Sequence, residues 1–303
     1  MSYFTDVFIS TNLKIGGCGE YSTWNNVFEG KVNSDIVIYG SSRALKHISP
    51  EIFIKSLHIS TYNLGIDGHN FWLQNFRHRM LLKNNTKPKI IIFSIDMFTL
   101  QKRKDLYNLE QFLPYMLWNK EIQKVTSCYE GFNRYDYEIP LVRYFGRKQS
   151  LVSAIRVFSG HLGCSSYRIR GYQGIDRSWT TDFDNAKFTN KKYEVILDTE
   201  TLLLFKRFLI ECKSKNIKLI FVYTPEYIEG QKFVKNRGVV MSIFTNLSKQ
   251  YHIPFYDYSS DPISHQKIYF YNANHLNKTG AELFTTKLID TLKQSNLIKN
   301  LNN

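Results

Sequence analysis

Three nearly uninterrupted apolar runs stand out along the chain. They are "IVIY" at 36–39 and the runs within "PKIIIFSID" at 88–96 and "IKLIFVYTP" at 217–225. Such runs are typical of strands that are buried on both faces of a sheet. "TYNLGIDG" at 61–68 indicates a further short strand followed by a glycine turn, and "IPFYDYS" at 253–259 indicates another strand. The pattern therefore predicts five strands.

Helical signals fall between these runs. Ser49 is placed to cap a helix in which Pro50 takes the first position and Glu51 favours the first turn. Thr279 and Glu282 have the spacing of a capping box for the last helix. Further helices are expected over 69–82, 198–216, 230–251 and 281–292.

Strands that alternate with helices predict a parallel sheet covered by helices on both faces. We expect a flavodoxin-like three-layer α/β/α fold with a five-stranded parallel sheet, formed as one domain over residues 1–303. Residues 100–195 break the alternation and are rich in aromatic side chains. They are expected to form an inserted accessory region between strands three and four.

Composition narrows the function classes. The chain is 43% hydrophobic and 22% charged, as in ordinary globular proteins, and its net charge is +14. A basic surface favours anionic partners, but the Lys and Arg residues form no long run and no nucleic-acid-binding signature appears. A nucleic-acid partner would rest on charge alone, so we expect none.

Cysteine spacing and hydropathy add further limits. Cys18, Cys128, Cys164 and Cys212 form no CxxC pair, so we expect neither a metal nor a cofactor. No apolar run is long enough to span a membrane. The N-terminus is too short and polar for a signal peptide. The chain is therefore cytoplasmic, or a targeting or membrane-associating segment lies outside it.

Polar residues follow the predicted strands where active sites of open α/β sheets gather. They are Gly40–Arg43 after the first strand, Asn63–Gly68 after the second, and Ser94 and Asp96 after the third. His275 precedes the last helix. A serine on a tight turn exposes its hydroxyl, and a histidine from the far end of the chain can accept its proton.

Three segments, "IVIYGSSRA", "YNLGIDG" and "NANHLNKTGAE", resemble blocks I, II and V of the SGNH (GDSL-like) hydrolase superfamily. More narrowly they resemble its exported bacterial branch of polysaccharide O-acetyl esterases and transferases. The resemblance implies Ser42 as nucleophile, His275 as base, and the Ser42 and Gly68 N–H groups as oxyanion donors. It also implies a periplasmic or other extracytoplasmic location.

The sequence departs from the family pattern at four positions. Ser41 replaces the block I Asp, and Ser94 and Asp96 replace the block III Gly and Asn. Asn272 stands where the family has an Asp, three residues before the histidine. An Asn carbonyl can orient the imidazole, but a flipped amide would favour the wrong tautomer. Three interpretations of Asn272 stay open. The site could be a Ser–His dyad, the protein could bind its ligand without catalysis, or Asn272 could be an engineered substitution.

Three neighbours of these positions are candidates for substrate contacts, each with a structural alternative. Arg43 could contact an anionic substrate or form a salt bridge. Asn63 could donate into the site or brace a turn, and Asp96 could cap or anchor one. The insert's aromatic residues suggest either a sugar-stacking wall or a small accessory core; they are Trp118, Tyr135, Tyr137, Tyr144, Tyr172 and Trp179.

The sequence thus favours a serine esterase or O-acyltransferase that acts on acyl, and by resemblance acetyl, esters of a bacterial surface carbohydrate or cell-wall polymer. The rival hypothesis is a non-catalytic glycan-binding or polysaccharide-assembly protein on the same fold. Hydrolase and transferase differ only in the acceptor, which the sequence does not specify.

Overall fold

The computed structural model describes residues 1–68, 71–161, 167–189 and 192–298. The chain forms two compact units. The first unit comprises residues 1–31 and 103–168, and the second comprises residues 32–102 and 169–303. Cys164 lies outside the described residues. Within the described residues, no helix combines the length and apolar character needed to cross a membrane.

The second unit is built on a five-stranded sheet in the order β2-β1-β3-β4-β5, with every neighbouring pair parallel. All five predicted strands are present. Their bounds are β1 Ile36–Gly40, β2 Thr61–Asn63, β3 Ile90–Ile95, β4 Lys218–Tyr223 and β5 Phe255–Asp257. β1 and β3 are in register from Ile36 and Ile90 to Gly40 and Ser94. The ends of these two strands therefore lie side by side, at the carboxyl edge of the sheet where the sequence predicts the active site.

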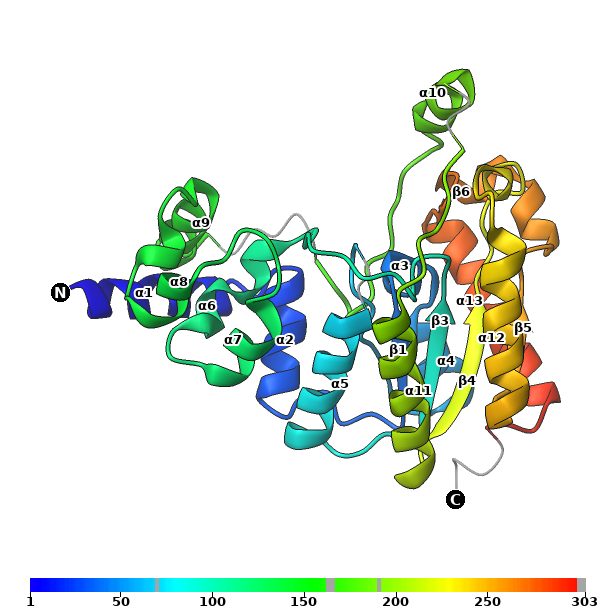
Figure 1. Cartoon of the computed structure of the whole chain (residues 1–303), viewed down its shortest axis with the longest axis horizontal. Helices are drawn as coiled ribbons and strands as arrows, with labels where there is room; N and C mark the ends of the chain where they lie inside the picture. The colour runs from blue at the N-terminus through cyan, green and yellow to red at the C-terminus, as the bar shows by residue number, and fades with distance from the viewer. Residues whose placement is uncertain (69–70, 162–166, 190–191, 299–303) are drawn as a thin grey trace. The chain divides into compact units, whose positions relative to one another are not determined.

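Helices cover both faces of this sheet, which gives the three-layer α/β/α arrangement predicted from the sequence. In Figure 1, α5, α11 and α12 lie in front of the strands, and α4 and α13 lie behind them. The helices of this unit are α3 Ser42–His47, α4 Pro50–Leu57, α5 Phe71–Asn84, α10 Asp182–Thr189, α11 Thr199–Ser214, α12 Arg237–Tyr251 and α13 Lys278–Gln294. Its short 3₁₀ helices are Gly230–Phe233, Pro262–His265 and Lys267–Tyr269.

Alternate strand residues fill two different cores, as the pleat requires. Ile36, Ile38 and Ile92 point to a core of aliphatic and aromatic side chains shared with α4 and α13. Tyr39, Phe93 and Phe221 point to the other face. There they meet an aromatic cluster from α5, α11 and α12, formed by Phe71, Phe205, Phe208 and Phe244. The site-bearing strand ends are therefore supported on both sides.

The C-terminal part of this unit differs locally from the prediction. His275 is not in a free loop but begins β7, His275–Leu276, which pairs antiparallel with β6, Phe270–Asn272. The last helix starts at Lys278, where Asn277 caps it by accepting a hydrogen bond from the Gly280 N–H at 3.0 Å. The predicted Thr279–Glu282 capping box is therefore wrong, because the helix begins before Thr279. α12 likewise starts at Arg237, after a 3₁₀ turn, rather than near 230.

The first unit is helical and combines the N-terminus with much of the predicted insert. Asp6 of α1 forms a buried two-pronged ion pair with Arg143, at 2.6 and 2.7 Å. α1 also packs along α9. These contacts explain why residues 1–31 group with 103–168, which the sequence pattern did not indicate. The helices are α1 Ser2–Ile15, α2 Glu20–Phe28, α6 Leu113–Met116, α7 Lys120–Thr126, α8 Arg134–Glu138 and α9 Lys148–Phe158, with 3₁₀ helices at Leu109–Phe112 and Val142–Tyr144.

Candidate active site

The structure brings Ser42, His275 and Asn272 into one hydrogen-bonded row. Ser42 Oγ lies 2.7 Å from His275 Nε2, although the two residues are 233 positions apart in the chain. On the other side of the ring, His275 Nδ1 lies 3.0 Å from Asn272 Oδ1. A nucleophile, a base and a group that orients the base are the parts that serine catalysis requires.

Backbone contacts determine which way the Asn272 amide faces. Its Oδ1 accepts hydrogen bonds from the backbone N–H groups of Asn274 and His275, each at 3.0 Å. A flipped amide would aim its NH₂ group at these two donors, so the oxygen must face them. The same oxygen then accepts from His275 Nδ1–H. Nε2 therefore carries the lone pair, which is the tautomer that can take a proton from Ser42.

The site keeps His275 in its neutral form. Burial, followed by the positive charges of Lys46 and Arg43, lowers the pKa of His275 to about 3. Asn272 supplies no negative charge that would oppose these effects. The imidazole is consequently ready to act as a base at neutral pH, but the imidazolium formed during catalysis lacks the carboxylate that usually stabilises it.

The turn after β1 presents Ser42 to the site. Gly40 has a φ of 138°, and a Cβ placed there would lie 2.4 Å from the Ser94 carbonyl oxygen of the adjacent strand. Ser41 caps α3 through its side chain, which accepts from the Arg43 N–H at 3.1 Å. Ser42 is therefore the first helical residue and remains partly exposed. At this position the backbone N–H has no partner within the helix.

His47, which the sequence gave no reason to select, holds the base's strand in place. Its Nε2 accepts the Leu276 N–H at 3.0 Å, and its Nδ1 lies 2.9 Å from Thr224 Oγ1. The imidazole is fully buried, and burial lowers its pKa well below the usual value. Neutral His47 thus links α3 to β7 and to the end of β4.

Arg43 is buried, and its guanidinium contacts other groups of the protein. Its guanidinium forms an ion pair with Glu226 at 2.9 Å, donates to the Thr224 carbonyl, and lies 4.3 Å from the Tyr223 ring centre. Only 5% of the residue is exposed. Of the two roles considered, the structure shows the salt bridge. Thr224 and Glu226 directly follow β4, so the rule of inspecting strand ends would have found both.

Asn63 and Asp96 also lie at strand ends, and each is engaged locally. Asn63 Nδ2 donates to the carbonyls of Ala44 and Ile48 at 2.7 and 2.9 Å, and its Oδ1 accepts from Gly65 at 2.9 Å. Asp96 Oδ1 accepts the Phe98 N–H at 2.8 Å. Asn63 therefore braces α3, and Asp96 anchors the turn after β3.

Gly65 and Gly68 shape the turn after β2. A Cβ on Gly65 would lie 2.5 Å from the Leu45 nitrogen, so the turn approaches α3 too closely for a side chain. Gly68 has a φ of 64°, in the left-handed region that glycine adopts readily. Within the described residues, the Gly68 N–H donates no hydrogen bond. It therefore remains free to act as the donor that the family resemblance implies.

The aromatic residues of the predicted insert divide between the two units. In the first unit, Tyr137 and Tyr144 are buried in its core, while Trp118 and Tyr135 are exposed. In the second unit, Tyr172 belongs to the core that α4 and α13 share, and the partly buried Trp179 packs against it. Tyr137 and Tyr144 thus have a packing role in the first unit, and Tyr172 and Trp179 have one in the second.

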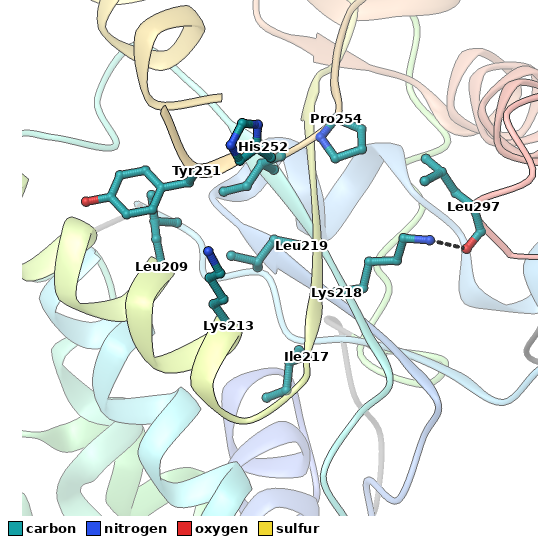
Figure 2. Close-up of a pocket in the computed structure, with 10 residues that line it drawn as sticks. Leu209, Lys213, Ile217, Lys218, Leu219, Tyr251, His252, Pro254 and Leu297 are labelled. Atoms are coloured by element: carbon teal, nitrogen blue, oxygen red, sulfur yellow. Dashed lines mark hydrogen bonds between the residues drawn. The ribbon is translucent and has the colours of Figure 1, made fainter. Parts of the chain in front are cut away.

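One pocket of the second unit lies at the other end of the sheet. It measures about 520 Å³ and is lined by the beginning of β4, the segment before β5 and the ends of α11 and α12, including Lys213, Lys218 and His252 (Figure 2). Its described lining residues include no serine or cysteine. Without a nucleophile beside the histidine, this pocket lacks the arrangement found at Ser42. Elsewhere too, the described residues contain no cluster of His, Cys, Asp or Glu suited to a metal ion.

Comparison with known proteins yields structural likenesses only. No family model and no curated protein matches the chain. A GDSL-like lipase from Bacteroides thetaiotaomicron is 11% identical, with 89% of this chain and 96% of the other covered at a TM-score of 0.37. A candidate acylhydrolase from Bacteroides fragilis is also 11% identical, with 86% of each chain covered at a TM-score of 0.37. Neither likeness is close enough to transfer a substrate or a residue role.

Proposed function

We propose that the protein is a serine esterase or O-acyltransferase that works through an acyl-enzyme on Ser42. The observation that carries this proposal is the 2.7 Å contact between Ser42 Oγ and His275 Nε2, with Asn272 fixing the tautomer of the ring. A binding protein would have no need for a neutral base aligned on a partly exposed serine.

The row of side chains supports a two-step reaction. Ser42 Oγ attacks the acyl carbonyl carbon while its proton passes to His275 Nε2. The imidazolium then gives this proton to the leaving alcohol oxygen, which releases the alcohol and leaves the acyl group on Ser42. Water or a second hydroxyl group then attacks the acyl carbon while its proton passes to Nε2. The bond between the acyl carbon and Ser42 Oγ breaks, and the imidazolium returns the proton to Oγ. Asn272 Oδ1 accepts from Nδ1–H throughout.

The Ser42 and Gly68 N–H groups are proposed to bind the tetrahedral oxyanion. Both lie on turns at the carboxyl edge of the sheet, and Gly68 makes no competing hydrogen bond within the described residues. Arg43 and Lys46 add positive charge near the base, as their effect on the pKa of His275 indicates. Both cations also form ion pairs, Arg43 with Glu226 at 2.9 Å and Lys46 with Asp67 at 3.1 Å, which offset part of their charge.

The proposed substrate is an acyl, and by resemblance acetyl, ester of a bacterial surface carbohydrate or cell-wall polymer. A location outside the cytoplasm is part of this proposal. Cys18 takes part in a disulfide bond, which fits an oxidising compartment. Either water or a sugar hydroxyl would serve as the acceptor.

A fluorophosphonate probe tests the nucleophile directly, because it reacts only with an activated serine. We expect labelling of the wild type, none in Ser42→Ala, and strongly reduced labelling in His275→Gln. Ser242→Ala, an exposed serine on α12, is the matched control and should label like the wild type. Well-folded wild-type protein that does not label would instead support the non-catalytic glycan-binding alternative.

A further inference from the structure

A second pocket of the second unit adjoins the site from the Asn272 side. It measures about 260 Å³ and opens to solvent. Phe183, Tyr193 and Phe233 supply aromatic surfaces, and Asp182, Asn272 and Asn274 supply polar groups. One member of the catalytic row is therefore also part of a pocket wall. Ser42 and His275 are not among the lining residues.

The orientation of Asn272 gives this wall a hydrogen-bond donor. Its Oδ1 is fixed by three N–H groups, so its NH₂ group must face away from them. Within the described residues, Asn272 Nδ2 donates no hydrogen bond. An aspartate at this position would offer only an acceptor here. The departure from the family pattern thus changes the chemistry of the pocket as well as that of the base.

The remaining groups narrow what the pocket can hold. Asp182 receives one hydrogen bond, from Thr180 Oγ1 at 2.8 Å, and retains further acceptor capacity. Its carboxylate disfavours an anionic occupant. Three polar side chains disfavour a purely hydrocarbon chain, while three aromatic rings favour a ring-shaped one. The combination suits a neutral ring that bears hydroxyl groups, which both accept from Asn272 and donate to Asp182.

We propose that this pocket binds a neutral, hydroxyl-bearing ring of the ester's alcohol portion or of the acceptor, and that Asn272 determines this specificity. Asn272 orients His275 with its oxygen and recognises the ring with its NH₂ group. The inference rests on the proposed esterase or transferase function, because it assigns the pocket to that reaction.

Substrate selectivity tests the inference. We compare kcat/KM for 4-nitrophenyl acetate with kcat/KM for mono-O-acetylated methyl glycosides of glucose, galactose and N-acetylglucosamine. In Asn272→Asp, the ratio of the best glycoside ester to the aryl ester should fall about tenfold, as expected for one lost hydrogen bond. Phe233→Ala should lower the same ratio by raising KM for the glycoside. An unchanged ratio in both variants would overturn the proposal.

A matched control and a binding measurement separate the two proposals. Ile196→Ala, an exposed residue outside the pocket lining, should leave the ratio as in the wild type. Saturation-transfer NMR of the Ser42→Ala protein with the methyl glycosides should show binding that Phe233→Ala removes. Glycoside binding without any wild-type turnover would refute the esterase and keep the binding pocket. Aryl-ester turnover with glycoside binding that is absent or insensitive to Phe233→Ala would refute the pocket alone.

Discussion

Two turns at the same edge of the sheet make different use of their polar side chains. β1 and β3 are paired in register up to Gly40 and Ser94, and in each chain segment a polar residue, Ser42 or Asp96, stands two positions after that pair. After β1, Ser42 is partly exposed and its hydroxyl meets His275. After β3, Asp96 is 3% exposed and its Oδ1 accepts the Phe98 N–H.

The difference shows that position at a strand end is not enough to make a residue functional. Asp96 stabilises its own turn, and Thr99 Oγ1 accepts its backbone N–H at 3.0 Å. The turn that carries Ser42 is stabilised by Ser41 instead, because the Ser41 side chain caps α3. A side chain that is accessible and not engaged in holding its own turn can react. This comparison predicts activity effects at one turn and stability effects at the other.

The largest effect is expected for Ser42→Ala. Loss of the nucleophile should reduce kcat for 4-nitrophenyl acetate by at least about a thousandfold, whereas the midpoint of denaturant unfolding should hardly move. Activity assays and urea titrations on the same preparation measure both quantities. Comparable loss of activity and of stability would mean that Ser42 is also a structural residue, and the contrast between the turns would disappear.

His47 should show the next largest effect, because it acts on the base through the backbone. His47→Phe leaves the Leu276 N–H without its partner, so β7 and His275 lose their support. We expect kcat to fall about tenfold to a hundredfold with KM nearly unchanged, and stability to fall by about 1–3 kcal/mol. In His47→Gln a side-chain carbonyl can accept the same N–H, so this variant should recover most of the lost kcat. Equal kcat in the two variants would refute the positioning role.

Asn272→Asp should change the pH dependence of kcat/KM, because it places a negative charge beside His275. The wild-type base has a pKa of about 3, so kcat/KM for the aryl ester should stay level as pH falls from 8 through 6.5 toward 5. A carboxylate beside Nδ1 stabilises the imidazolium and raises the pKa of His275. The protonated, inactive base then appears at higher pH, so the acidic limb of the variant should move upward.

The same change should raise the plateau turnover of the aryl ester, by about tenfold, because the imidazolium of the transition state gains a counter-charge. Full pH–rate profiles from pH 4 to 9 check both effects. A profile that coincides with that of the wild type would remove Asn272 from the catalytic row.

Much of the fold could be predicted because its signals are local. Apolar runs such as the one within 88–96 predict the strands, and the places of Ser42 and His275 beside predicted elements indicate that the two residues approach each other. The grouping of 1–31 with 103–168 was not predicted, because the buried pair of Asp6 and Arg143 looks like two ordinary charged residues in sequence. His47 was missed because its partners come from the distant ends of β4 and β7, which no local pattern connects.

The smallest effect on activity is expected for changes in the turn after β3. These changes test most directly whether the turns after β1 and β3 differ in function. Asp96→Ala removes the acceptor of the Phe98 N–H, which should lower the free energy of unfolding by about 1 kcal/mol and change kcat less than about threefold. Asp96→Asn keeps an oxygen in this place and should restore most of the stability, although it removes the negative charge near Arg43. Denaturant titrations of the three proteins measure this order. If Asp96→Ala instead loses activity while its stability stays at the wild-type value, the carboxylate acts in the reaction, and the two turns are alike after all.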